Sequence, residues 1–264
     1  MDGLQEYYAR GEEDARLRAG AGLLELLRTE ELVRRYLPEA PASVVDIGGA
    51  TGAHARWLAR DGYQVYLVDP VELHVSAASA IPGVRATLGD ARALDAEDGS
   101  YGFALMCGPL YHLLAAEDRA AAWREARRVV RPGGHVAAAT ISRFAALHDG
   151  LHRGLLADNG FREMVGRDLA TGVHRPPEGS PFDWFTETYF HHPAEAAEEA
   201  RAAGLTEVST FAIEGTGWLI PHAELDARLR EERERERLLW ALRQTETEPS
   251  VLGASAHLLT VGRS

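Results

Sequence analysis

Asp46 and the glycines after it are the residues whose types and spacing point most directly to chemistry. An apolar run carries Asp46 near its end and breaks into a turn that contains Gly48, Gly49 and Gly52. Glycines let a backbone approach a ligand closely and adopt dihedral angles that other residues resist. A tight glycine turn between a strand and the N-terminus of a helix is therefore suited to a nucleotide-like ligand.

A second acid, Asp69, lies 23 residues after Asp46 and closes another apolar run, Tyr63 to Val68. An acid at the end of the second strand of a nucleotide-binding unit can accept hydrogen bonds from a ribose diol. Later apolar runs end at Gly89–Arg92 (GDAR) and at Cys107–Leu113 (CGPLYHL). Candidate ligand-binding residues therefore recur where successive apolar runs end.

A sheet must position these residues. Five apolar segments alternate with helical segments up to Ile141, and a turn at Arg131–Gly134 (RPGG) begins the fifth. Two further strands are expected at Leu205–Ile213 and Ser255–Val261. The alternation predicts an α/β fold with a doubly wound parallel sheet, whose ligand lies at the carboxyl ends of the strands.

In this order the motifs resemble those of class I S-adenosylmethionine-dependent methyltransferases of the small-molecule type. The turn D-I-G-G-A-T-G resembles the family's first motif, and GPLYHL followed by REARRVVRPGG resembles its fourth strand and the turn into its fifth. The resemblance implies a Rossmann-like seven-stranded methyltransferase sheet with helical cap insertions, S-adenosylmethionine as cofactor, and a methyl group transferred to a small-molecule acceptor through an oxygen, nitrogen or carbon nucleophile.

The resemblance also implies which residues bind the cofactor. Asp69 would hold the ribose, Asp90 and Ala91 the adenine, and Cys107 with Gly108 the floor beside the methyl group. An aromatic ring near a sulfonium is favourable through cation–π attraction, which suggests a role for tyrosines of the N-terminal segment. The other residues expected at this site are Tyr7, Tyr8, Asp46, Gly48, Gly49, Ala50, Gly52, Pro70 and His112.

Histidine is the natural candidate for a base, because it titrates near neutral pH. A hydroxyl or protonated amine acceptor must lose a proton, whereas methyl transfer itself depends mainly on proximity and orientation. His112 follows the fourth strand, and His191 and His192 precede a predicted helix at Pro193–Ala203. Each of the three histidines is a candidate catalytic residue, and a role in ordering a loop or the cofactor remains open for each.

Two alternatives stay open beside methyl transfer. A protein that binds S-adenosylmethionine or its demethylated product without turnover would keep the same motifs. A nicotinamide-dependent oxidoreductase is disfavoured because Gly48, Gly49 and Gly52 fit the spacing G-x-G-x-x-G poorly. The chain also departs from the methyltransferase pattern at Ala50, which replaces the middle glycine, and at Gly102, where an acid is common.

Composition narrows the partners. All 28 basic residues are arginine, and the formal net charge is −12, which argues against nucleic acid as a partner because phosphate binding needs positive patches. Without lysine, a Schiff base and a Walker-type phosphate loop are excluded. No secretory signal or membrane span is evident, and Cys107 is the single cysteine. We expect a cytoplasmic monomer or homodimer, with no membrane partner and no metal site.

The rest of the chain predicts additions to the nucleotide-binding core. Residues 1–40 would form an N-terminal helical lid, 41–142 and 193–264 the cofactor-binding core, 143–192 a cap insertion and 215–253 a second helical insertion. The cap insertion is expected to contain one helix, Leu147–Phe161. Helix-period leucines and alternating charges in the second insertion indicate a helix with a solvated face. Aromatic residues of the insertions could line an apolar acceptor pocket: Trp184, Phe185, Tyr189, Phe190 and Trp218.

Overall fold

The fold is taken from a computed structural model that describes residues 16–181 and 184–264. The chain divides into two compact units. We call Leu32–Thr140, Glu195–Ser209 and Thr260–Ser264 the sheet unit. The helical unit comprises the described residues as far as Glu31, together with Ile141–Ala194 and Thr210–Leu259.

The sheet unit is built on five parallel strands. They are β1 (Ser43–Ile47), β2 (Gln64–Asp69), β3 (Val84–Leu88), β4 (Tyr101–Met106) and β5 (Val130–Ser142), and they lie in the order β3-β2-β1-β4-β5. The chain therefore runs outward in one direction to β3 and then crosses back to β4. This reversal of strand order is the switch point of a doubly wound sheet, as the sequence predicts.

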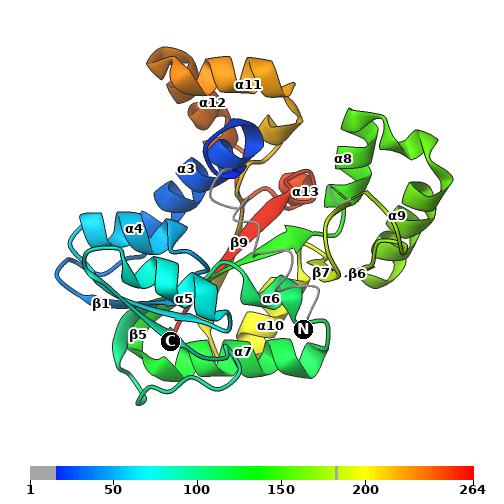
Figure 1. Cartoon of the computed structure of the whole chain (residues 1–264). Coiled ribbons are helices and arrows are strands. Elements are labelled where there is room, and N and C mark those ends of the chain that lie inside the picture. Colours follow the sequence, from blue (N-terminus) through cyan, green and yellow to red (C-terminus); the bar gives the residue numbers. More distant parts are fainter. Residues whose placement is uncertain (1–15, 182–183) are drawn as a thin grey trace. The chain divides into compact units, whose positions relative to one another are not determined.

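Helices cover this sheet because its strands are apolar on both faces. In the sheet unit, α4 (Ala53–Arg60) and α5 (Glu72–Ser79) contact β2 and β3. Helix α7 (Ala116–Val129) contacts β4 and lies beside α10 (Glu195–Ala202), and the short α6 (Pro109–His112) precedes α7 (Figure 1). Alternate residues of β1, β4 and β5 pack against α7 and α10 in one buried cluster that includes Val45, Ile47, Ala104, Met106, Val136, Ala138, Trp123, Ala126 and Ala200.

Two further strands complete the seven that the family resemblance implies. Strand β9 (His257–Arg263) pairs with β5 and with β8 (Thr206–Ala212). Within the sheet unit, the Ser264 carbonyl accepts from the Gly133 N–H, and the Ser264 N–H donates to Gly134. The seven-stranded methyltransferase fold predicted from the sequence is thus confirmed.

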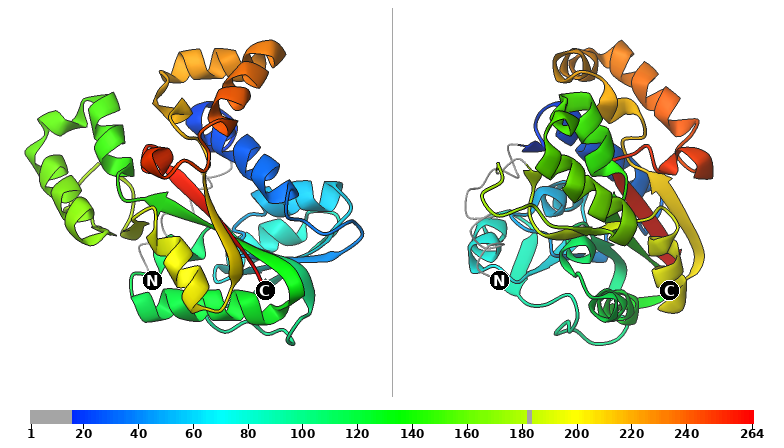
Figure 2. Two further views of the ribbon diagram at one scale, coloured as in Figure 1. Left: turned by 180° about the vertical axis from the view of Figure 1, so that it is seen from behind. Right: turned by 90° about the vertical axis from the view of Figure 1, so that its right-hand side faces the viewer.

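In the helical unit, α3 begins at Gly20 and runs to Arg34, its last residues belonging to the sheet unit. Its Leu24 packs with buried leucines of α11 (His222–Arg230) and α12 (Glu232–Arg243), which lie together in both views of Figure 2. The opposite face of α12 is charged, with an ion pair between Arg237 and Glu234. A short turn, η3 (Gly217–Leu219), and helix α13 (Pro249–Leu252) flank the pair α11–α12 along the chain.

The segment after β5 differs from the single helix expected between Leu147 and Phe161. It forms α8 (Ala145–Arg153), a short turn η1 (Leu155–Ala157) and α9 (Asn159–Thr171). The break occurs at Gly154, whose φ of 75° ends α8, and Asp158 starts α9 by accepting a 3.0 Å hydrogen bond from the Phe161 N–H. A left-handed glycine followed by an aspartate cap is a strong stop and restart signal, which the single-helix interpretation overlooked.

Two short strands in the helical unit were not expected. Strand β7 (Thr188–His191) pairs in parallel with the end of β5, placing Ile141 opposite Phe190, and β6 (Val173–His174) pairs with β7 in antiparallel fashion. Both are too short to give a readable alternation of apolar and polar residues. In the part of the chain that the structure describes, no helix is long and apolar enough to cross a membrane.

Candidate cofactor site

The strand register of the sheet unit brings the predicted site residues to one edge. Ile47 lies opposite Val68, Asp69 lies opposite Leu88, and Asp46 lies opposite Leu105. All these strands are parallel, so the residues that follow them leave the sheet at the same side. The glycine turn, Asp69, the Gly89–Asp90 turn and the Cys107–Gly108 turn therefore share the carboxyl edge of the sheet.

The glycine turn is packed so closely that side chains would not fit. At Gly48, where φ is 67°, an added Cβ would lie 2.6 Å from Pro109 Cγ. At Gly49 it would lie 2.6 Å from both Asp46 Oδ2 and Leu67 Cδ1. Gly52, with φ of 89°, directly precedes α4. The turn therefore needs its glycines for space as well as for backbone conformation.

Ala50 occupies a left-handed conformation, with φ of 47°. A residue with a Cβ is strained there, typically by about 1 kcal/mol or more. The Ala50 N–H donates to Asp69 Oδ2 at 2.9 Å. The hydrogen bond joins the first turn to the acid of the second strand, and it holds the strained peptide in place.

Asp46 is a buried acid whose two oxygens have no hydrogen-bond partner among the described residues. Burial, and then the negative charge of Asp69, raise the pKa of Asp46 to about 7, and a weaker approach of the Ala55 N–H only partly opposes them. A buried carboxylate without donors costs free energy unless something supplies positive charge or hydrogen. The Asp46 carboxylate is thus suited to binding a cationic or hydrogen-bond-donating group.

Asp69 is held firmly at the end of β2. Its Oδ1 accepts from the Val71 N–H at 2.9 Å and lies 2.9 Å from His74 Nδ1, while Oδ2 accepts from Ala50. His74 is itself 3% exposed, and its Nδ1 lies within hydrogen-bond distance of the carboxylate. Oδ2 has one described donor and therefore keeps room for another. His74 was not predicted from the sequence, although its position on the helix after Asp69 is a signal that spacing could have revealed.

Asp90 is already engaged by an arginine in the same turn. The Arg92 guanidinium donates from Nε at 2.9 Å to Oδ1 and from Nη2 at 2.6 Å to Oδ2, and the Arg92 N–H donates as well. This contact holds the pKa of Asp90 below its usual range. Arg92 also pairs with Asp118 on α7 at 3.1 Å. Asp90 and the half-buried Ala91 are therefore fixed in place before any ligand binds.

The fourth strand ends in Cys107 and Gly108. A Cβ on Gly108 would come within 3.0 Å of the Gly48 carbonyl oxygen, so the first and fourth turns touch. The Cys107 carbonyl accepts a 3.1 Å hydrogen bond from the Tyr111 hydroxyl. Burial lowers the pKa of His112 to about 4, despite the opposing charge of Asp69. His112 is therefore a neutral imidazole at pH 7, able to accept a proton but only weakly basic.

The remaining predicted residues fall in different parts of the chain. His191 and His192 belong to the helical unit; His191 is buried with its ring 4.8 Å from that of Tyr189, and His192 is exposed beside Phe144. Pro70 directly follows Asp69 and is exposed. Tyr7 and Tyr8 lie outside the described residues.

The aromatic residues expected to line one pocket take part in separate contacts of the helical unit. Trp184 lies edge-on to Phe161 at 5.1 Å, and Phe190 stacks on His174 at 4.5 Å. Trp218 Nε1 donates to the Ala254 carbonyl at 2.8 Å. The Nδ1 atom of the same His174 lies 2.8 Å from Oδ2 of the buried Asp168, a pair that was not foreseen from the sequence.

Comparisons with known proteins agree with this geometry. A family described as "Methyltransferase domain" matches residues 44–134, the stretch that carries β1 to the start of β5. An uncharacterised methyltransferase of Mycobacterium tuberculosis is 32% identical over 197 residues, which is 74% of this chain and 67% of that protein. The same figures hold for its counterpart in Mycobacterium bovis.

Solved structures share the fold. A methyltransferase of Thermotoga maritima, described as a possible histamine N-methyltransferase, has a TM-score of 0.57 at 20% identity and covers 98% of both chains. Phosphoethanolamine N-methyltransferase 2 of Haemonchus contortus, solved with S-adenosylmethionine, has a TM-score of 0.57 at 16% identity and covers 94% of this chain and 54% of its own. With the matching family and relatives, the chain belongs to the class I S-adenosylmethionine-dependent methyltransferases.

Proposed function

We propose that this methyltransferase acts on a small-molecule acceptor and binds S-adenosylmethionine at the carboxyl edge of the sheet unit. The main support for this site is Asp46, a buried carboxylate without a partner among the described residues. It lies next to a glycine turn that has no room for side chains. The cofactor's amino-acid part carries an ammonium group. Its positive charge would give the Asp46 carboxylate a partner. The residues present therefore fit the cofactor.

Each turn of the edge has a separate role in this proposal. Asp69, oriented by His74 and by backbone N–H groups, accepts a ribose hydroxyl at Oδ2. Asp90 and Ala91 contact the adenine, with Asp90 sharing its carboxylate with Arg92. Cys107 and Gly108 form the floor beside the methyl group. The bound cofactor supplies a methyl group already activated by a positively charged sulfur.

His112 is the proposed proton acceptor. At a pKa of about 4 its imidazole is neutral at pH 7 but cannot take a proton from an alkylammonium group, which holds its proton far more tightly. It suits a nucleophile whose proton becomes strongly acidic as the new bond forms, as with a hydroxyl oxygen. We therefore favour a hydroxyl acceptor, or an amine that arrives uncharged. The net charge of −12 favours neutral or cationic acceptors over anionic ones.

Calorimetric titration of the ligand-stripped protein tests the cofactor site. We expect micromolar-range binding of S-adenosylmethionine and S-adenosylhomocysteine and none of NADH. Asp69→Asn should weaken binding, whereas Asp95→Asn, at an exposed aspartate of the same unit, should not. Equal binding by the two variants would remove the assignment of the ribose to Asp69.

Acceptor screening then follows the release of S-adenosylhomocysteine. Panels of phenols, amines and carboxylic acids would be compared at one pH, with and without protein. Turnover confined to carboxylates or phosphorylated compounds would contradict the preference for uncharged or cationic acceptors. Turnover of phenols or neutral amines would support it.

A further inference from the structure

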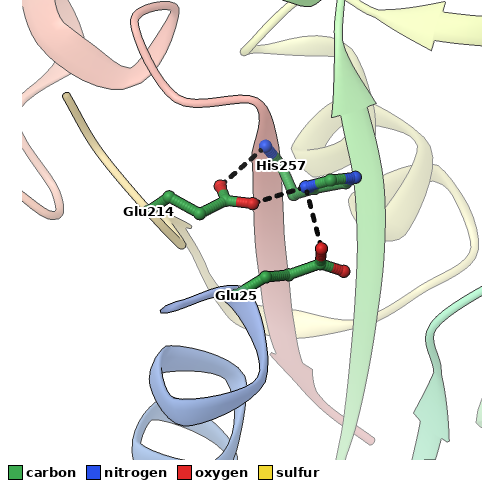
Figure 3. Close-up of side chains that lie close together, drawn as sticks. All are labelled: Glu25, Glu214 and His257. Atoms are coloured by element: carbon green, nitrogen blue, oxygen red, sulfur yellow. Dashed lines mark hydrogen bonds and ion pairs between the residues drawn. The ribbon is translucent and has the colours of Figure 1, made fainter. Parts of the chain in front are cut away.

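Three potential metal ligands meet in the helical unit, well separated along the chain. Glu25 comes from α3, Glu214 follows β8 and His257 begins β9. Figure 3 shows both glutamates directed at His257 Nδ1, with Glu214 Oε1 at 2.5 Å and Glu25 Oε2 at 3.7 Å. One ligand atom from each residue lies within 4.8 Å of the other two. No short sequence motif predicts this cluster of ligands, because the three residues are at positions 25, 214 and 257.

Glu214 is fixed by contacts that leave one oxygen for the cluster. It is 1% exposed, and its Oε2 accepts from the Ser255 hydroxyl and from the His257 N–H, both at 2.9 Å. Ser255 in turn accepts from the Glu214 and Gly215 N–H groups. Outer hydrogen bonds of this kind orient the carboxylates of metal sites. Glu214 Oε1 is thereby directed at His257.

The cluster attracts positive charge. Both carboxylates face the same imidazole nitrogen, so an ion at this position would meet two acidic side chains. Among the described residues, Arg16 also faces the cluster; its Nη1 lies 2.5 Å from Glu25 Oε2 and its Nη2 lies 3.2 Å from Oε1. Arg16 is partly exposed, so it can keep Oε1 if Oε2 turns to another cation.

We propose that Glu25, Glu214 and His257 form a binding site for a divalent transition-metal ion such as Zn²⁺. Such an ion binds imidazole nitrogen and carboxylate oxygen at about 2.0–2.2 Å, which places tetrahedral ligand atoms about 3.4 Å apart. The distances of 2.5 and 3.7 Å from Nδ1 lie on either side of that value, and all three ligand atoms lie within 4.8 Å of one another, so side-chain rotations without backbone movement could bring them to that spacing. Ca²⁺ and Mg²⁺ prefer oxygen alone, so the imidazole favours a transition metal.

The site has access to solvent and a structural role. The side chains of His257 and Glu25 are 21% and 18% exposed, which leaves room for water as a further ligand. An ion here would join α3 to the segment after β8 and to the start of β9, three parts of one unit. It would therefore stabilise the helical unit.

Metal titration of the full-length, chelator-treated protein tests the proposal. We expect one Co²⁺ per chain, seen as visible d–d absorption that Zn²⁺ abolishes, and a rise in melting temperature with Zn²⁺. Glu214→Gln and His257→Gln should weaken Zn²⁺ binding at least about tenfold. The matched control is His222→Gln, which removes an exposed histidine paired with Asp226 on α11 of the same unit.

Further measurements keep a folding defect separate from loss of a ligand. Glu25→Gln changes a partly exposed residue and offers a second ligand variant if Glu214→Gln does not fold, as judged by circular dichroism. Wild-type protein that takes up no Co²⁺ or Zn²⁺ would overturn the proposal, as would ligand variants that bind Zn²⁺ as tightly as His222→Gln. Titration of the same samples with S-adenosylmethionine tests the cofactor site independently.

Discussion

Replacing Asp46 with asparagine should stabilise the ligand-free protein while weakening its hold on the cofactor. Asp46 is fully buried, and its pKa rises from 3.8 to about 7 on folding. Because the folded pKa is raised, the folded state binds more protons than the unfolded state, and the free energy of unfolding falls as pH rises between about 4 and 7. The shift corresponds to roughly 4 kcal/mol above pH 7.

Asparagine removes that charge but keeps the size of the side chain. Its amide would also lack partners, at a cost of about 1–3 kcal/mol. We therefore expect Asp46→Asn to raise the free energy of unfolding by about 2 kcal/mol at pH 8.5, the difference between these two terms. At pH 6 the gain should be smaller by about 1 kcal/mol, because part of the ionisation penalty is absent there.

Urea denaturation at pH 6 and pH 8.5 measures this effect, with Asp95→Asn as the control at an exposed aspartate. Calorimetry with S-adenosylmethionine on the same samples should show at least about tenfold weaker binding by Asp46→Asn, since hydrogen bonds to charged groups contribute about 1.5–3 kcal/mol. A destabilised Asp46→Asn at pH 8.5, or a gain independent of pH, would refute the view of Asp46 as an uncompensated buried carboxylate.

Three further predictions test other residues of the same edge. Asp69→Ala should weaken S-adenosylmethionine binding at least about tenfold in calorimetry, because a hydrogen bond to a charged group contributes about 1.5–3 kcal/mol; unchanged affinity would remove the ribose assignment. Ala50→Gly should raise the free energy of unfolding, measured by urea denaturation, by about 0.5–1 kcal/mol. Glycine relieves the strain at φ of 47° but loses more entropy on folding, so the net gain is small. A loss of stability would contradict this prediction. His112→Gln should lower kcat by a factor of about 10²–10⁴ while changing cofactor affinity little. The kcat of the wild-type protein should stay level from pH 6 to 8, because the pKa of His112 is about 4. An unchanged kcat in the His112→Gln variant would exclude His112 as the base.

Those parts of the fold that depend on local sequence were predictable. The apolar runs of β1, β2 and β4 and the residues that end them, such as Asp69 and Cys107, follow from patterns a few residues long. Parallel pairing then brings those ends to one edge without further information. The same local logic identified the glycine turn, whose crowding the structure shows directly.

Other features depend on contacts between distant residues and could not be read from spacing. Helices α8 and α9 were taken as one because the helical period continues across Gly154, whose left-handed φ is visible only in the structure. The group of Glu25, Glu214 and His257 forms through packing of three segments, of which the first lies 189 residues from the second and 232 residues from the third. Charge and burial at such places are properties of the tertiary fold, not of the local sequence.

The properties of Asp46 depend both on the local sequence and on contacts made in the tertiary fold. Its place before the glycines identifies an acid near a ligand-binding turn, but the sequence does not tell whether neighbouring N–H groups satisfy it. In the folded chain two N–H groups of the first turn are directed elsewhere: Ala50 donates to Asp69, and Gly48 donates to Val68 at 2.6 Å. Asp46 is left buried and unpaired among the described residues, which opposes folding above pH 7. A residue that opposes folding in this way, at the place where three turns converge, is best explained by a cationic ligand that supplies the missing partner.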